Sequence, residues 1–311
     1  MGRPRVLRPQ LRRDSLGGAV TDPVPYETVV YFDSVYFIES LRPDEFYTGK
    51  EIFENVVRPR SGTGVNVATA HFHVATTPQL LKQLDAIAAH CADKKRASIL
   101  QIDVHGSEEG VQLSSGETVS WEQLAEPLAR INQACQFNLV VFSAACFGYY
   151  MVKALNPTIR APAWGIIGPQ DELQAGDLYD AAKLFYETLF EKSDLRTAVG
   201  AMNPGKEYQD WFIRILPAEI MFCRLFNIYA TQIATAANDK ERASRIVAQI
   251  APRLGRDVQK TLKARAFIEA YLKDRRFWFN RLRTHFLMLD LFPKNAARFP
   301  LTFEECTRGA V

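Results

Sequence analysis

The chain has 311 residues, enough for one large domain or for a domain with an appended unit. Its 38 Lys and Arg nearly balance its 35 Asp and Glu, so net charge does not indicate nucleic acid as the main partner. The longest apolar stretch, LVVFSAACFGYYMV from Leu139, is shorter than the ~20 residues that a membrane helix needs, and the chain does not open with a secretory signal pattern. We therefore expect a cytoplasmic protein without a membrane partner.

The first 25 residues form a basic segment without apolar periodicity. They contain Arg3, Arg5, Arg8, Arg12 and Arg13 together with several prolines and two adjacent glycines. This composition predicts a flexible arm. A tether for an acidic surface and a targeting peptide are the alternatives.

From Tyr26 to about residue 204, apolar runs of strand length alternate with helical patterns. Strands are expected in ETVVYFDSVYFIE, VNVATAHFHVAT, ASILQIDVHG, FNLVVFSAAC and APAWGIIGP. Helices are expected in DEFYTGKEIFENVV, TPQLLKQLDAIAAHC and WEQLAEPLARINQAC, and a hairpin in GVQLSSGETVSW. Such alternation predicts an α/β fold with a mainly parallel sheet between helices, in which ligands bind beyond the carboxyl ends of the strands.

Residues 205–311 have a different pattern. They are rich in aromatics and arginine, show helical periodicity, and contain no recognisable strand. We expect an all-helical C-terminal unit. Its run KDRRFWFNRLRTHF interleaves arginines with aromatic residues, which also occurs where single strands of nucleic acid stack. The favoured interpretation is an amphipathic helix with buried rings, so nucleic acid is not the expected partner.

The cysteines do not form a recognisable metal or disulfide pattern. There are five, Cys91, Cys135, Cys146, Cys223 and Cys306, with no CxxC pair. The odd count is typical of a reducing compartment in which thiols stay free. His71 and His73 alternate on one strand, but no third zinc ligand lies nearby in sequence. No phosphate-binding glycine loop occurs either, and we expect neither a metal nor a cofactor.

Two of the expected strands end in residues that suit nucleophilic catalysis. QIDVHG places His105 and Gly106 at one strand end, and VVFSAACFG places Cys146 at another. If the strands are parallel neighbours, both side chains reach the same edge. An imidazole beside a thiol favours the thiolate, which is the nucleophile. The backbone N–H groups of Gly106 and Cys146 would then form an oxyanion hole, and the helix expected in CFGYYMVKAL would direct its amino end at the thiolate.

The order of these motifs resembles that of the caspase-like (clan CD) cysteine peptidases, and most closely their bacterial CHAT-type branch. VHG and SAACFG are separated by a hairpin and a helix, GVQLSSGETVSWEQLAEPL, that are similar to those after the family's histidine. WGIIGPQDEL resembles the strand after the cysteine, and AAKLFYETLFEKSDLRTAVGAMN resembles the closing helices. The similarity assigns residues 26–204 to a peptidase domain and leaves the helical unit unexplained.

The resemblance implies a caspase-like fold and a thiol protease, a hydrolase that cleaves protein substrates. It makes His105 the general base or acid, Cys146 the nucleophile, and the N–H groups of Gly106 and Cys146 the oxyanion hole. Proteins of the CHAT-type branch often serve in bacterial defence or cell death and wait for an activating partner or ligand. Residues 205–311 would then be a partner-binding or regulatory unit.

The sequence also departs from the family's pattern. Two alanines, Ala144 and Ala145, stand where one is usual, and Phe147 occupies a position where a small or polar residue is common. Access to the thiol should therefore be narrower than in the family. The caspase signature, QAC followed by R, Q or G and then G, is absent, so cleavage after aspartate is not inferred.

Acidic residues near the strand ends are the candidates for a substrate pocket. Asp33, Asp171 and Glu172 match the places where the family builds its specificity pocket. A pocket lined by carboxylates would select Arg or Lys at the cleaved residue through charge-assisted hydrogen bonds. The alternative for Asp171 and Glu172 is an ordinary surface loop.

Three functional interpretations remain open. The first is a cysteine endopeptidase that uses His105 and Cys146. The second is a catalytically silent scaffold with the same fold, and the third is an unrelated α/β binding protein in which both residues are structural. Thiol reactivity separates the first two, and adjacency of the two strands separates both from the third.

Overall fold

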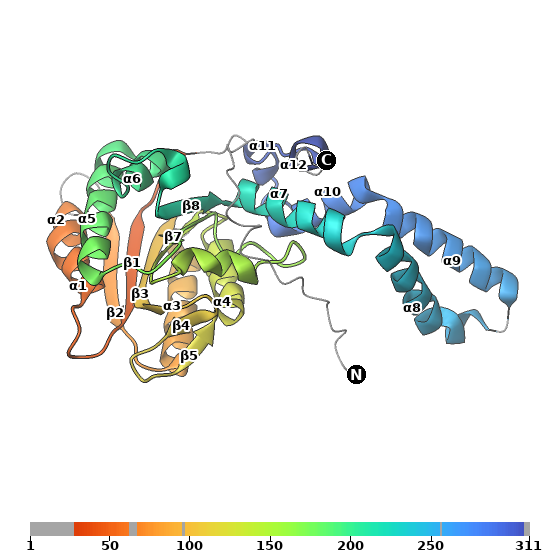
Figure 1. Cartoon of the computed structure of the whole chain (residues 1–311), viewed down its shortest axis with the longest axis horizontal. Helices are drawn as coiled ribbons and strands as arrows, with labels where there is room; N and C mark the ends of the chain where they lie inside the picture. Colours follow the sequence, from red (N-terminus) through yellow and green to blue (C-terminus); the bar gives the residue numbers. More distant parts are fainter. Residues whose placement is uncertain (1–27, 62–66, 95–96, 256, 308–311) are drawn as a thin grey trace.

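The computed structural model describes residues 28–61, 67–94, 97–255 and 257–307 (Figure 1). The basic segment at residues 1–25 lies outside the described residues. An eight-stranded sheet forms the larger part of the molecule, with the main strand order β2-β1-β3-β6-β7-β8 and with β4 and β5 attached as a hairpin to β3. The strands are β1 (Ser34–Ser40), β2 (Ala68–His73), β3 (Ser98–Gly106), β4 (Gly110–Gln112), β5 (Thr118–Ser120), β6 (Leu139–Ala144), β7 (Gly165–Pro169) and β8 (Ile213–Pro217).

The main sheet is parallel except at one edge. The pairs β1 with β2, β1 with β3, β3 with β6 and β6 with β7 are all parallel, whereas β8 runs antiparallel to β7. The central strands are apolar and buried on both faces, as parallel strands covered by helices require. This confirms the expected α/β class with a mainly parallel sheet flanked by helices.

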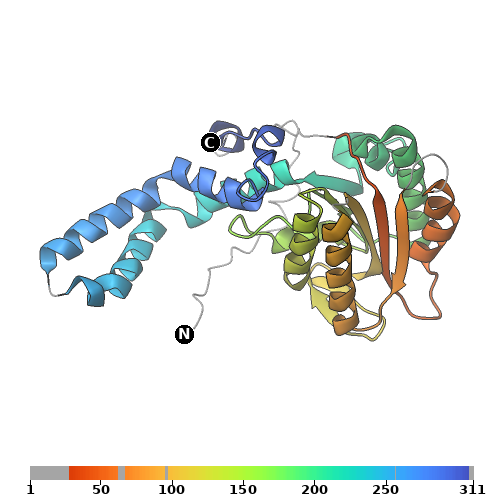
Figure 2. The same cartoon turned by 180° about the vertical axis from the view of Figure 1, so that it is seen from behind.

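Side chains alternate between two helical layers. Phe37 packs its ring against Phe53 and Tyr186, whereas its neighbour Tyr36 packs against His90 on the other face. The first layer contains α1 (Thr48–Ile52), the π-helix η2 (Phe53–Val57), α2 (Arg58–Ser61), α5 (Ala175–Lys192) and α6 (Leu195–Ala201). The second contains α3 (Thr77–Lys94) and α4 (Trp121–Ala134), which lie in front of the sheet in Figure 2.

The connection between β3 and β6 matches the expected hairpin and helix. Gly116 adopts φ +89°, a left-handed conformation that glycine tolerates, in the turn between β4 and β5. Ser120 then begins α4 with a capping box, in which its hydroxyl accepts from the Gln123 N–H at 3.2 Å and the Gln123 side chain accepts from the Ser120 N–H at 2.9 Å. These local signals fix the crossover that carries the chain from His105 to Cys146.

The C-terminal region is helical but does not begin at residue 205 as expected. Residues 213–217 form β8 and extend the sheet, a strand that the sequence interpretation missed because Ile213 and Ile215 run directly into an apolar helix. The elements after the 3₁₀ helix η4 (Tyr208–Asp210) and β8 are α7 (Ala218–Ile228), the π-helix η5 (Tyr229–Ile233), α8 (Ala236–Leu254), α9 (Val258–Lys273), α10 (Arg275–Phe286), α11 (Asn295–Arg298) and α12 (Phe303–Thr307). Figure 1 shows α8 and α9 extending far from the sheet.

The cysteines differ from the expectation of five free thiols. Cys223 on α7 and Cys306 on α12 form a disulfide, while Cys91, Cys135 and Cys146 are free. Their separation of 83 residues explains why spacing gave no signal, since helix packing alone brings them together. None of the described helices is both long and apolar enough to cross a bilayer.

Candidate active site

His105 and Cys146 lie at the same edge of the sheet, on adjacent strands. The last paired residues of β3 and β6 are Asp103 and Ala144, in parallel register. His105 and Cys146 each follow two residues later, so both lie at the carboxyl edge of the sheet, with Cys146 in the turn just after β6. Adjacency of the two strands, which the sequence left open, is therefore present.

The main chain at Gly106 packs directly against Cys146. A Cβ atom at Gly106 would overlap the carbonyl oxygen of Cys146 and would lie 2.9 Å from the Cβ of Ala145. Only glycine permits this approach. The two strand ends are therefore held together at the position where the sequence predicted an oxyanion hole from the N–H groups of Gly106 and Cys146.

Cys146 sits in a tight turn after β6. The N–H of Gly148 donates to the carbonyl of Ala145 at 2.9 Å, and Phe147 takes a left-handed conformation with φ +57°. The helix that follows is a short 3₁₀ helix, η3 (Gly148–Ala154), not the α-helix expected in CFGYYMVKAL. The Cys146 thiol is half-buried and lies 3.7 Å from the carbonyl oxygen of Leu173, to which it donates.

Glu45 is a site residue that the sequence analysis missed. It lies in the loop between β1 and α1, and its Oε1 is 2.8 Å from Nε2 of His105. Partial burial raises the pKa of Glu45, but hydrogen bonds from the main chain and guanidinium of Arg42 and from His105 outweigh it and lower the pKa to about 2. No motif marks this residue, because it contacts His105 across 60 positions of sequence.

This contact determines which nitrogen of His105 carries a proton. A carboxylate can only accept hydrogen bonds, so Nε2 must donate to Glu45. Nδ1 is then the nitrogen that remains to take a proton from a thiol. Among the described contacts, His105 bonds to Glu45 and Cys146 to Leu173, and the two side chains do not hydrogen-bond to each other.

The pocket candidates divide between the two edges of the sheet. Asp171 follows β7 at the carboxyl edge, and its carbonyl accepts from the N–H of Phe147 at 3.3 Å. Asp171 and Glu172 are both exposed beside the turn that holds Cys146. Asp33 directly precedes β1, where its main chain pairs with Ala97 and Ala68, so the structure places it at the amino edge, away from Cys146.

A buried polar cluster lies beneath the candidate dyad. Glu39 and Asp103 are paired in register on β1 and β3, and both are at most 1% exposed. Oε1 of Glu39 accepts from the N–H of Gly49 at 2.9 Å, and Oδ1 of Asp103 accepts from the Thr48 hydroxyl at 3.3 Å and from the Gln101 amide at 2.9 Å. Burial and then the charge of Glu39 raise the pKa of Asp103 well above its usual range. The cluster ties the start of α1, and so the loop that carries Glu45, to the sheet.

The histidines on β2 take part in this structural network. Nε2 of His71 is 2.9 Å from Oε2 of Glu39, and Nε2 of His73 is 3.3 Å from the carbonyl oxygen of Leu41. Within the described part of the chain, no group of three His, Cys, Asp or Glu side chains is arranged to hold a metal ion.

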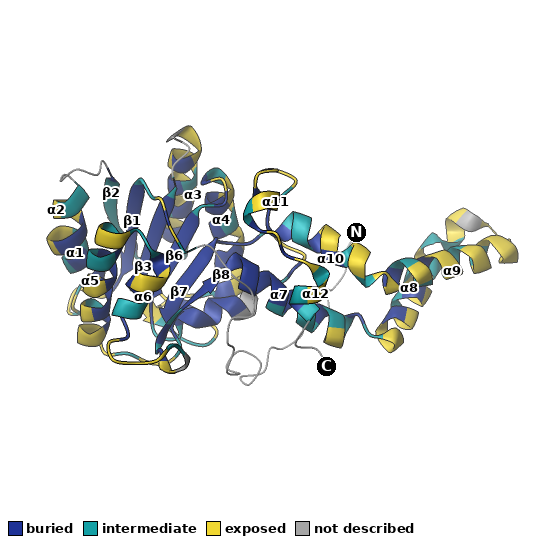
Figure 3. Ribbon diagram, turned by 90° about the horizontal axis from the view of Figure 1, so that it is seen from above, coloured by how far each residue is buried: buried dark blue, intermediate teal, exposed yellow. Residues whose placement is uncertain are grey.

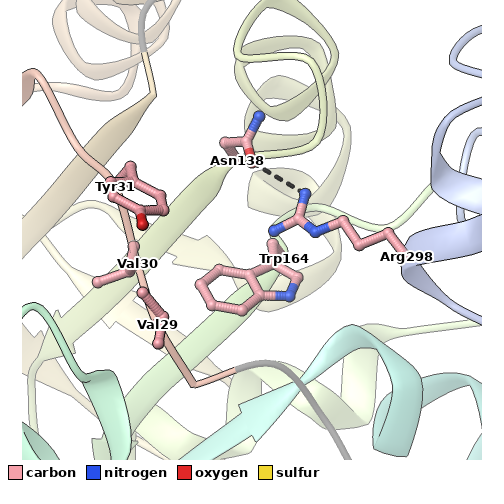
Figure 4. A pocket seen from close by; sticks show the side chains of 6 residues that line it. All are labelled: Val29, Val30, Tyr31, Asn138, Trp164 and Arg298. Atoms are coloured by element: carbon pink, nitrogen blue, oxygen red, sulfur yellow. Dashed lines mark hydrogen bonds between the residues drawn. The ribbon is translucent and has the colours of Figure 1, made fainter.

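A separate pocket of about 190 Å³ lies at the opposite edge of the sheet (Figure 4). It is lined by residues that precede β1, β6 and β7 and by one residue of α11: Val29, Val30, Tyr31, Asn138, Trp164 and Arg298. The Arg298 guanidinium lies 5.0 Å from the centre of the Trp164 ring and donates to Oδ1 of Asn138 at 2.8 Å. The residues that line this pocket come from the amino edge of the sheet and from the helical region, and they do not include His105 or Cys146.

Comparisons with known proteins identify no family for this chain. No family model matches the sequence, and no curated protein matches it. Among solved structures the chain is similar to the Drosophila initiator caspase Dronc, with a TM-score of 0.39 and 12% identity over 65% of this chain and 86% of that one. A likeness of this size assigns neither an activity nor a substrate.

Proposed function

We propose that this chain is a caspase-like cysteine endopeptidase of the CHAT type that uses His105 and Cys146 to cleave protein substrates. The observation that carries the proposal is the placement of both residues at the carboxyl edge of adjacent parallel strands, with the main chain of Gly106 packed on Cys146. The context that the resemblance implies, bacterial defence or cell death, is part of the same proposal.

In the proposed reaction, Nδ1 of His105 takes the thiol proton while Nε2 stays bonded to Glu45. The thiolate attacks the scissile carbonyl, and the N–H groups of Gly106 and Cys146 stabilise the oxyanion. The imidazolium then protonates the leaving amine, and water hydrolyses the thioester. Glu45 stabilises the imidazolium by its negative charge, and so acts as a positioning residue.

Selection of a basic residue at the cleaved position is supported by Asp171 and Glu172. Both carboxylates are exposed beside the Cys146 turn and would pair with an Arg or Lys side chain. Asp33 has no part in this pocket because it lies at the other edge. Asp171→Ala should reduce hydrolysis of a peptide with Arg at the cleaved position more than of one with a neutral residue, and equal losses would contradict this specificity.

A latent form of the site is also part of the proposal. The thiol donates to the carbonyl oxygen of Leu173 and not to His105, so the thiol must shift away from Leu173 before the dyad forms. We propose that a partner or ligand of the helical region causes this shift. The same contact favours the alternative function, a catalytically silent scaffold in which the thiol stays bonded to Leu173.

Alkylation of Cys146 tests the proposal. The rate with iodoacetamide is measured by mass spectrometry from pH 5 to pH 9 in the natural sequence and in His105→Ala. Cys91 and Cys135 are buried, so their alkylation reports unfolding. A dyad predicts rapid reaction of Cys146 below pH 8 that slows at least about tenfold without His105. Equal rates in the two proteins would favour the scaffold.

A further inference from the structure

The helices α8, α9 and α10, residues 236–286, form an arm whose charge differs from that of the whole chain. The arm contains 13 Lys and Arg but only 5 Asp and Glu, whereas the chain has 38 against 35. Figure 3 shows that exposed residues cover much of α8 and α9. A surplus of this size on one extended element creates a positive field that attracts anions.

Four of the five acidic residues of the arm are each offset by a basic neighbour within it, and the remaining basic residues leave the arm with an excess of positive charge. Four form ion pairs with arm residues: Asp239 with Arg275 at 2.6 Å, Glu269 with Arg265 at 3.0 Å, Asp257 with Lys260 at 3.5 Å and Glu241 with Arg245 at 3.6 Å. The fifth, Asp274, caps α10 by accepting from the N–H of Phe277 at 2.9 Å. Among the described contacts, Lys263, Lys273 and Arg281 have no carboxylate partner.

The arm has its own small core, and two of its aromatic rings are exposed outside that core. Ala243, Ile268 and Leu272 are buried between α8 and α9, with Ile246, Val247, Ile250 and Trp278 packed around them. Phe267 is 72% exposed and Phe277 is 39% exposed. Both rings contact Tyr271 but leave apolar surface in water, and adjoining exposed rings of this kind are a surface that a binding partner can cover.

These rings adjoin one another on the same face as basic residues. Lys260, Lys263, Phe267 and Tyr271 are three or four positions apart on α9 and so share one side of the helix. The rings of Phe267 and Tyr271 are nearly parallel at 6.4 Å, and Phe277 continues the row 4.9 Å from Tyr271. We call Lys260, Lys263, Phe267, Tyr271 and Phe277 the aromatic-basic face.

We propose that the aromatic-basic face binds single-stranded nucleic acid, with bases stacked on the rings and phosphates paired with the lysines and arginines. Exposed rings in a positively charged track are what single strands require, because every base offers an aromatic face and every nucleotide a phosphate. A protein partner fits less well, since lysine is depleted in the cores of protein interfaces. Within the run KDRRFWFNRLRTHF, Phe277 is 39% exposed and so departs from the expected helix with buried rings, whereas Phe279 and Phe286 are buried as expected.

The test uses the full chain and fluorescently labelled 20-nucleotide single strands of RNA and DNA, with anisotropy as the readout. Substitutions at Phe267 separate stacking from apolar contact. Phe267→Ala and Phe267→Leu should both weaken binding about fivefold to 100-fold, whereas Phe267→Trp should bind as tightly as the natural sequence. Leu262→Ala, which removes an exposed apolar side chain elsewhere on α9, is the matched control and should change little.

Competition experiments distinguish single-stranded nucleic acid from other anionic partners, such as acidic peptides and membranes. Polyglutamate and vesicles that contain phosphatidylserine, supplied at the same concentration of charge as unlabelled oligonucleotide, should displace the labelled strand much less effectively. Equal displacement by either, full binding by Phe267→Leu, or no binding of a single strand at 100 mM salt would each overturn the proposal. The readout does not involve Cys146, so its result is independent of the proposed peptidase activity.

Discussion

The sheet unit and the arm use charged and aromatic side chains in opposite ways. At the carboxyl edge of the sheet, polar side chains bond to one another, as Glu45 does with His105 and Glu39 with His71, while rings such as Phe37 and Phe142 are buried. In the arm, the rings of Phe267 and Phe277 are exposed and the basic charge is in excess. The comparison shows that one chain can hold polar groups in fixed contacts at the edge of its sheet and present exposed rings and basic groups on its arm.

The largest effect on peptide hydrolysis should come from His105→Ala, which tests whether the proposed reaction depends on the sheet edge and not on the arm. Loss of the general base should reduce peptide hydrolysis by about 10²-fold to 10⁴-fold, measured with an Arg-containing fluorogenic peptide and any activator that is found. Oligonucleotide binding by the arm should stay unchanged. His90→Ala, on the other face of the sheet, is the control; similar losses in both variants would contradict a specific role.

Glu45→Gln should have the next largest effect. The amide keeps the shape but not the charge that stabilises an imidazolium, so hydrolysis should fall roughly 10-fold to 100-fold, a fraction of the whole acid–base contribution. The folded-state pKa of Glu45 is lowered from 4.5 to about 2, so its stabilising contacts are complete above pH 4.5 and are lost as pH falls toward 2. The Gln variant should therefore lose less stability than the natural sequence over that range in acid unfolding. Glu54→Gln, which removes an exposed ion pair with Arg58, is the control; its hydrolysis rate and its acid unfolding should match those of the natural sequence.

Gly106→Ala tests the close approach of the two strand ends. The added methyl group overlaps the main chain of Cys146, which should lower the free energy of unfolding by about 1–3 kcal/mol and slow alkylation of Cys146. Guanidinium unfolding measures the first effect. Gly176→Ala is the control, because a Cβ atom there has no neighbour within 4 Å. Unchanged stability in Gly106→Ala would mean that the strands do not meet as described.

Asp103→Asn should have the smallest effect on activity, less than about threefold, since the amide oxygen keeps the bonds from Thr48 and Gln101. Its effect on stability should depend on pH. Because the folded-state pKa of Asp103 is raised, the natural sequence loses stability as pH rises above about 4, and the neutral Asn does not share this loss. The variant should therefore gain relative stability between pH 5 and pH 8. An identical pH dependence in both proteins would contradict a protonated Asp103.

The sequence predicted the sheet, and it predicted that His105 and Cys146 stand at strand ends, because both features depend on local patterns. The apolar runs that end at His105 and Cys146 became β3 and β6, and the turn signal at Gly116 and the cap at Ser120 fixed the crossover between them. The alternation of strands and helices indicated a mainly parallel sheet, whereas the order of the strands and the adjacency of β3 and β6 came from the structure.

The features that the sequence did not predict depend on contacts between distant residues. Glu45 lies in a loop without a motif, and only folding places it on His105. Asp33 was a pocket candidate only through the family resemblance, whereas β1 begins at Ser34 and leaves Asp33 at the amino edge. The disulfide between Cys223 and Cys306 likewise arises from the packing of α7 on α12.

The antiparallel direction of β8 determines where the helical region leaves the sheet. β7 ends at the carboxyl edge, but β8 runs back, and α7 starts where the N–H of Ala218 donates to the carbonyl of Trp164, before β7. The five-residue strand β8, about 17 Å long, therefore separates the start of α7 from the carboxyl edge of the sheet, where Cys146 lies. Under the two proposals, a nucleic acid on the arm would leave the carboxyl edge of the sheet open to a polypeptide, so binding and cleavage would not compete for the same surface.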